Sequence, residues 1–94
     1  MRVPTPLERL NGRSSIEAYE GAKEILQKGD PETVRAVVNV LLRGDRVLNR
    51  AAAAHALNFT QGKSVVLALE KAVANKREHP KVRGQAAVTG QIGS

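Results

Sequence analysis

Cysteine and tryptophan are both absent from this chain of 94 residues, and Tyr19 and Phe59 are its only aromatic residues. The lack of cysteine excludes disulfides, thiolate zinc sites and a cysteine nucleophile. The scarcity of aromatic rings means that a core must be built from Ala, Val, Leu and Ile. We therefore expect an interior that is held together only by the packing of aliphatic side chains.

Long apolar segments are missing as well. No uninterrupted apolar run approaches the about 20 residues that cross a bilayer, and residues 1–6 lack the apolar core of a secretory signal. Hydrophobic residues make up 41% of the chain and charged residues 26%, a balance typical of globular proteins, and the length suits one domain. The sequence thus predicts a cytoplasmic domain with no membrane partner.

Patterns that indicate catalysis are not evident. His55 and His79 have no second histidine or carboxylate at a ligand-like spacing, so we expect no metal site. Ser14, Ser15 and Ser64 are interpreted as helix-start residues, since no base can be paired with them. Most of the glycines fall at expected helix ends, and no glycine-rich phosphate loop follows a strand. The chain is predicted to be non-enzymatic and to use no cofactor.

The net charge of +6 lies entirely in the second half of the chain. Residues 1–45 contain seven basic and seven acidic side chains, whereas residues 46–94 contain eight basic side chains against Glu70 and Glu78. The two halves should therefore attract different partners.

An alanine-rich stretch, residues 49–57, lies near the middle of the chain. Alanine is the strongest helix former, but an isolated alanine helix of this length is marginal in water. We predict a central helix packed closely between the Val/Leu-rich segments 33–42 and 64–73.

Capping signals and helical spacing of apolar residues predict the other elements. Thr5-Pro6-Leu7-Glu8 and Ser14-Ser15-Ile16-Glu17 have the form of capping boxes, Asp30-Pro31 starts a further helix, and Asp45 is expected to cap the alanine helix. The expected helices are a short one ending at Gly12, then 14–29, 31–44, 45–57, 63–75 and 80–93. Apolar residues spread over most of the circumference of the 31–44 helix, which is therefore expected to be largely buried.

The chain also repeats itself. A shift of 31 residues places Gly21-Ala22 on Ala52-Ala53, and a further shift of 34 places that pair on Ala86-Ala87. Two kinds of helix thus alternate in an A-B-A-B-A order, at a period typical of helical repeat arrays. We predict that the three small pairs face one another and that the B helices line the concave side of a curved stack.

These residues carry a family resemblance. His79-Pro80-Lys81-Val82-Arg83, followed by Ala86-Ala87 and by Gly90-Gln91-Ile92-Gly93, resembles the first helix of a short HEAT-like repeat of the bacterial and archaeal kind. Residues 45–57 and 30–42 resemble corresponding first and second helices. The resemblance implies an all-α, right-handed superhelix (an α-α solenoid) over 14–94, with 1–13 as a tail or short capping helix. It also implies inter-repeat bonds from Asp45 and Arg83, and a protein-binding scaffold, with a minority of members that bind DNA or act in cofactor attachment.

Two surface features follow from the expected helices. A polar stripe on the B helices is the predicted partner-binding surface, although a solvated helix face has the same pattern. Its members are Glu32, Arg35, Asn39, Arg43, Lys63, Glu70 and Lys71. A basic cluster could instead contact the phosphates of a nucleic acid or simply add solubility. Its members are Lys71, Lys76, Arg77, Lys81 and Arg83. No aromatic residue interleaves this cluster, so stacking on single strands is not expected.

The last expected helix has no B-type partner to cover it. Its outer side would expose Val82, Ala86, Val88 or Ile92. We therefore expect this end to dock on a second copy in a homo-oligomer, on another protein, or on further downstream sequence.

Overall fold

A computed structural model of the protein describes residues 3–92, with side chains through residue 87. These residues form six helices and no strand, which confirms the all-α prediction. The helices are α1 (Pro6–Leu10), α2 (Ser15–Gln27), α3 (Pro31–Arg43), α4 (Val47–Leu57), α5 (Lys63–Ala74) and α6 (Pro80–Ile92).

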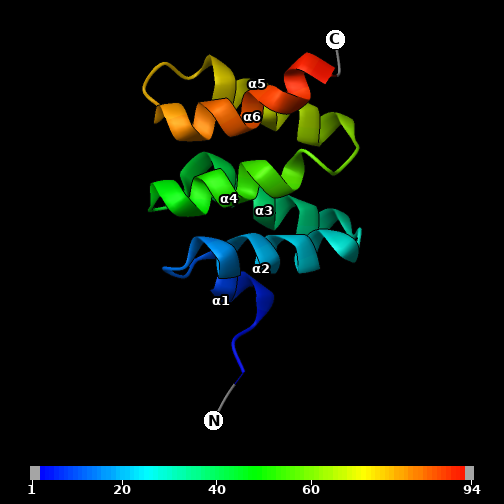
Figure 1. Ribbon diagram of the computed structural model, residues 1–94. Coiled ribbons are helices and arrows are strands. Elements are labelled where there is room, and N and C mark those ends of the chain that lie inside the picture. The colour runs from blue at the N-terminus through cyan, green and yellow to red at the C-terminus, as the bar shows by residue number, and fades with distance from the viewer. Residues whose placement is uncertain (1–2, 93–94) are drawn as a thin grey trace.

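The helices alternate between two layers (Figure 1). In one layer α2 packs against α4 and α4 against α6, while α3 packs against α5 in the other. Neighbours in the first layer pack more extensively than α3 and α5 do. The concave position of α3 and α5 stays a prediction.

The predicted capping box is present in full at the start of α1 and in part at the start of α2. The Thr5 hydroxyl accepts a hydrogen bond from the Glu8 backbone N–H at 3.2 Å, and the Glu8 carboxylate accepts one from the Thr5 N–H at 3.1 Å. At α2 only half of the expected box is present, because Ser14 Oγ accepts from the Glu17 N–H at 3.3 Å without a reciprocal bond. The bonds to the Thr5 and Ser14 hydroxyls satisfy backbone N–H groups that a helix start leaves without partners.

The predicted cap of α4 is wrong. The N-cap residue is Arg46, its side chain makes no cap hydrogen bond, and Asp45 is exposed. The Arg46 guanidinium instead donates to the Asn11 carbonyl at 3.2 Å. At α3, Asp30 occupies the N-cap position as expected, but its side chain makes no cap bond. The start of α4 is thus fixed by bonds to a distant loop rather than by a local carboxylate.

The core is centred on α4, as the alanine stretch predicts. Ala51, Ala52, Ala53, Ala54, Ala56 and Leu57 are all buried. Methyl side chains let α2, α3 and α6 approach this one helix, because little volume separates the backbones. By contrast, the prediction that α3 is largely buried is wrong: Val37, Val40 and Leu41 are buried, but Leu42 is 40% exposed. A helix that packs against its neighbours with one side needs only one apolar face.

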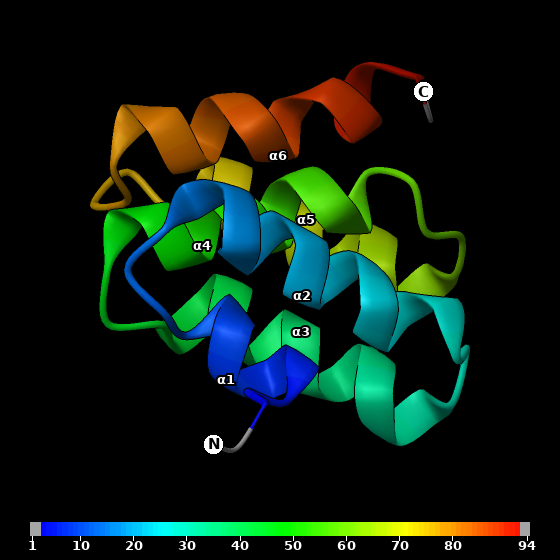
Figure 2. The same ribbon diagram turned by 60° about the horizontal axis from the view of Figure 1, so that its bottom comes forward.

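The missing side chain of Gly21 lets a different helix approach from the one expected. A Cβ atom at Gly21 would lie 2.4 Å from the Pro6 carbonyl oxygen and 2.9 Å from the Leu10 nitrogen. The missing side chain therefore makes room for α1, which packs on α2 at the N-terminal end of the stack (Figure 2). Ala22, Ala53 and Ala86 are fully buried, whereas a side chain at Gly21 would point at α1.

The C-terminal helix is better covered than predicted. Val82 and Ala86 are fully buried, so the expectation that they would be left open is wrong. They are covered because α6 packs against both α5 and α4. The side chains of Val88 and Ile92 lie outside the described residues.

Candidate functional site

The predicted partner-binding stripe is exposed and does not line a single hollow. All seven of its side chains are exposed, and none takes part in an ion pair within the described chain. Arg35 lines a groove of about 310 Å³ between α3 and α5, together with Val34 and Val38. Asn39 and Arg43 line a separate depression of about 220 Å³ that includes Leu7 of α1. Arg35 thus lies at one hollow and Asn39 and Arg43 at another, while the other four residues of the stripe line neither.

The predicted basic cluster loses one member. Arg83 is half-buried, and its Nε donates to the Val73 carbonyl at 3.1 Å, which fastens α6 to α5. Such an inter-helix bond is the role that the family resemblance implies for Arg83. The other members, Lys71, Lys76, Arg77 and Lys81, are exposed around the turn between α5 and α6.

Glu78 lies in the same turn, but its charge faces inward. Its carboxylate accepts hydrogen bonds from Arg50 Nε at 3.1 and 3.0 Å, and its side chain is only 8% exposed. Arg50 Nη1 also donates to the Gly44 carbonyl at 2.8 Å. The pair joins α4 to the turn and removes an acidic charge from the basic surface.

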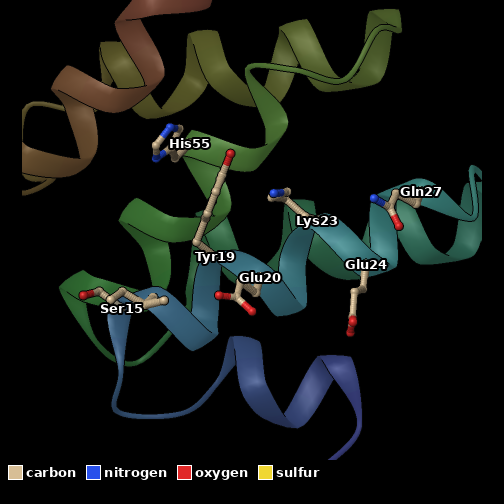
Figure 3. Close-up of a pocket in the computed structure, with 8 residues that line it drawn as sticks. Ser15, Tyr19, Glu20, Lys23, Glu24, Gln27 and His55 are labelled. Atoms are coloured by element: carbon tan, nitrogen blue, oxygen red, sulfur yellow. The ribbon is translucent and has the colours of Figure 1, made fainter.

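A row of three rings on the outer side of α2 and α4 was not foreseen from the sequence. The Tyr19 and His55 rings stack with centroids 4.4 Å apart and planes 25° apart, and the His55 and Phe59 centroids are 5.8 Å apart. Figure 3 shows Tyr19 rising from α2 toward His55 on α4. His55 is half-buried, as predicted, but it joins the only two aromatic residues of the chain. We call Tyr19, His55 and Phe59 the ring row.

Hollows lie on both sides of Lys23 along this row. One of about 550 Å³ lies against Ile16, Tyr19 and His55, and another of about 290 Å³ lies against Phe59. Lys23 and Gln27 line both hollows, so the two form one surface along α2 and α4. Phe59 is 75% exposed and Ile16 is 71% exposed. The surface therefore combines large exposed apolar groups with ordered rings.

The charged side chains beside the ring row differ in their partners. Arg9 of α1 binds Glu20 at 3.2 Å and Glu24 at 2.7 Å. Both carboxylates point toward α1 and away from His55 (Figure 3). Lys23 Nζ lies 5.2 Å from the centre of the Tyr19 ring and, within the described residues, has no carboxylate partner. Glu20 and Glu24 line the same hollow as Lys23, so the two cations and the two carboxylates beside the ring row balance.

Helical spacing could have found only half of this row, because His55 and Phe59 are four positions apart. Tyr19 and His55 are 36 positions apart, so no local pattern joins them. An indirect signal was the run of small residues around His55, which lets α2 come near enough for the rings to meet.

No metal centre is evident in the described part of the chain, because no three His, Cys, Asp or Glu side chains gather there. None of the helices in residues 3–92 has the length and apolar character of a membrane span. Comparisons with protein-family models, curated proteins and solved structures found no match to this chain.

Proposed function

We propose that the protein is a non-enzymatic scaffold of the HEAT-like kind, whose exposed helix faces bind another protein. The alternation of helices between two layers supports the scaffold, and the repeat of small residues along the sequence agrees with it. In this proposal the layers continue as a right-handed superhelix, and the bonds from Arg50 and Arg83 to preceding helix ends hold successive hairpins together.

One observation carries the binding role: the chain has two aromatic residues, and neither is buried in the core. Aromatic side chains bury more apolar area than any others, so a small core would gain most from enclosing them. Tyr19 instead packs against the edge of the core beside His55, while Phe59 is 75% exposed on the other side of His55, and Ile16 nearby is exposed as well. Exposed aromatic groups of this kind are enriched in protein–protein interfaces.

The test is affinity capture with the full chain from an extract of its source cells, after nuclease treatment and at about 50 and 300 mM salt. A protein interface with an apolar centre should keep its partner under both conditions, because salt screens exposed charges but not apolar contacts. Recovery of no specific protein after nuclease treatment would contradict the proposal. Size-exclusion chromatography with light scattering would test the homo-oligomer predicted earlier.

A second candidate, binding to a nucleic-acid backbone, is favoured by one observation. The Arg50–Glu78 pair withdraws an acidic charge and leaves Lys71, Lys76, Arg77 and Lys81 exposed near one turn. A complex held by such contacts should weaken steeply with salt. Titration of a 20-base-pair duplex with the wild-type chain and with the Lys76→Gln/Arg77→Gln variant measures this. Equal affinities of the two proteins would exclude the turn as the contact.

A further inference from the structure

The loop between α1 and α2 contains the only asparagine of the chain that is followed by glycine, Asn11 before Gly12. We propose that Asn11 is a deamidation site that the folded loop keeps closed, and that its reaction releases α1 from α2. This inference is independent of the scaffold proposal, because it concerns the chemistry of the chain itself.

The reaction needs only water and the atoms of this dipeptide. The Gly12 nitrogen attacks the side-chain carbonyl carbon of Asn11 and gives up its proton to water. A nitrogen–carbon bond forms, the side-chain amide leaves as ammonia, and the product is a cyclic imide. Water then opens the imide at either carbonyl. The result is aspartate, or an isomer in which the backbone runs through the former side chain.

The residue after the asparagine decides how easily the ring closes. Glycine has no side chain to hinder the approach of its own nitrogen. The other four asparagines, Asn39, Asn49, Asn58 and Asn75, are followed by Val, Arg, Phe and Lys. Asn11 is therefore the position in this chain where the reaction is least hindered.

In the folded chain the reacting groups are held apart. The Asn11 ψ angle of 9° places the Gly12 nitrogen beside the Asn11 nitrogen rather than beside the Asn11 side chain. The Gly12 N–H, which must lose its proton, donates to the Arg9 carbonyl at 3.0 Å. The Asn11 side-chain nitrogen donates to the Leu7 carbonyl at 3.0 Å. Ring closure therefore requires rotation about the Asn11 Cα–C bond and the loss of both hydrogen bonds.

The central helix resists this rotation. The Asn11 carbonyl accepts a hydrogen bond from Arg46 at 3.2 Å, and the Gly12 carbonyl accepts one from Asn49 Nδ2 at 2.8 Å. Asn49 is 1% exposed, so its amide has no water to replace a lost partner. Rotation of the Asn11–Gly12 peptide group moves the Asn11 carbonyl directly and displaces the Gly12 carbonyl after it. The reaction thus proceeds only from a locally opened loop.

The products cannot restore these contacts. Aspartate at position 11 has no side-chain N–H for the Leu7 carbonyl, and its negative charge lies at the C-terminal end of α1, where the helix carbonyls disfavour it. The isomer lengthens the backbone by one carbon, so the two carbonyls lose the spacing that Arg46 and Asn49 require. Both products should therefore hold α1 less firmly on α2.

The first experiment compares reaction rates in the folded and the unfolded chain. The full chain is kept at mildly alkaline pH and body temperature, with or without enough urea to unfold it. Cleavage after glutamate releases the peptide 9–17, in which mass spectrometry measures the amide-to-acid change. Urea should speed the reaction at Asn11 by at least about tenfold. Equal rates, or no reaction in urea, would overturn the inference. Asn75 is the internal control and should react in neither condition.

Matched variants test the contacts with α4. Asn49→Ala removes the donor to Gly12 and should speed the reaction in the folded protein by at least about fivefold. Arg50→Gln removes a bond to the turn between α5 and α6 and should leave the rate unchanged, although it also destabilises the protein. Arg46→Gln replaces Asn49→Ala if circular dichroism shows that variant to be unfolded. Equal rates in the α4-contact variant and Arg50→Gln would overturn the inference.

The release of α1 is tested with Asn11→Asp, which supplies one product directly. Its melting temperature should be lower than that of the wild type, and hydrogen exchange in the peptide 9–17 should be faster. Asn39→Asp makes the same change at an exposed position of α3 and should not destabilise the protein. An Asn11→Asp protein with the melting temperature and exchange of the wild type would show that deamidation leaves α1 in place.

Discussion

Asn49 on α4 donates a hydrogen bond from Nδ2 to the Leu10 carbonyl at 2.7 Å, across the junction between α1 and the rest of the stack. The same nitrogen donates to the Gly12 carbonyl at 2.8 Å. Asn49 is 1% exposed and is the only polar or charged residue in the described part of the chain that is buried as a whole. One amide group thus fixes the loop between α1 and α2 against the central helix.

Replacing this amide should destabilise the fold. We expect Asn49→Ala to lower the free energy of unfolding by about 1–3 kcal/mol, because two carbonyl groups lose a buried donor. Asn39→Ala makes the same change at an exposed position of α3 and should alter stability by less than about 0.5 kcal/mol. Urea unfolding followed by circular dichroism measures both. Equal midpoints for the two variants would show that the bond contributes nothing.

Gly21 and Gly84 make a matched pair of helical glycines. Alanine at Gly84 meets no atom within 4 Å and should stabilise the protein by up to about 1 kcal/mol through helix propensity. Alanine at Gly21 gains the same propensity, but its Cβ would lie 2.4 Å from the Pro6 oxygen. We expect a net loss of about 1–3 kcal/mol and detachment of α1. Thermal unfolding gives the sign of each effect, and a stabilised Gly21→Ala protein would contradict the close contact.

The Arg50–Glu78 pair should matter more than the Arg9 pairs. Arg50→Gln leaves a carboxylate with an 8% exposed side chain unpaired, so we expect a loss of about 3 kcal/mol. Arg9→Gln removes two contacts to glutamates whose side chains are 54% and 50% exposed, and should cost about 0–1 kcal/mol. Denaturant titrations at low and high salt compare the two. The Arg50 effect should persist in high salt, because a buried pair is poorly screened.

Overpacking tests the close approach of the alanine layer. Ala53 is fully buried, so Ala53→Leu should destabilise the protein by about 1–3 kcal/mol. Ala74→Leu adds the same volume at an exposed position of α5 and serves as the control. The melting temperatures of the two variants compare the sites directly. An Ala53→Leu variant as stable as the wild type would mean that space remains between α4 and its neighbours.

Much of the secondary structure was predictable because its signals are local. Four helices begin within one residue of the predicted position. Their starts are marked by Thr5, Ser14 and the prolines at positions 6, 31 and 80. The alanine run predicted the central buried helix for a reason that is equally local, since only small side chains let several helices surround one. The prediction of an Asp45 cap for α4 was wrong. The helix begins after Arg46, whose side chain bonds to the Asn11 carbonyl, 35 positions away.

The candidate site was much less predictable. The polar stripe was correctly expected to be exposed, but the hollows that three of its members line depend on where α1 and α5 lie. The basic cluster lost Arg83 to a contact with Val73, and the neighbouring Glu78 faces inward to Arg50. No spacing rule indicates either contact.

The sequence by itself determined six helices, their order and the small central helix, because capping, propensity and apolar periodicity act over a few residues. Only the tertiary structure decided that Gly21 accommodates α1 and that Tyr19, His55 and Phe59 meet on one face. These relationships depend on how far each helix is rotated and shifted against its neighbours. Those shifts are set by the packing of many side chains at once, so no single segment encodes them.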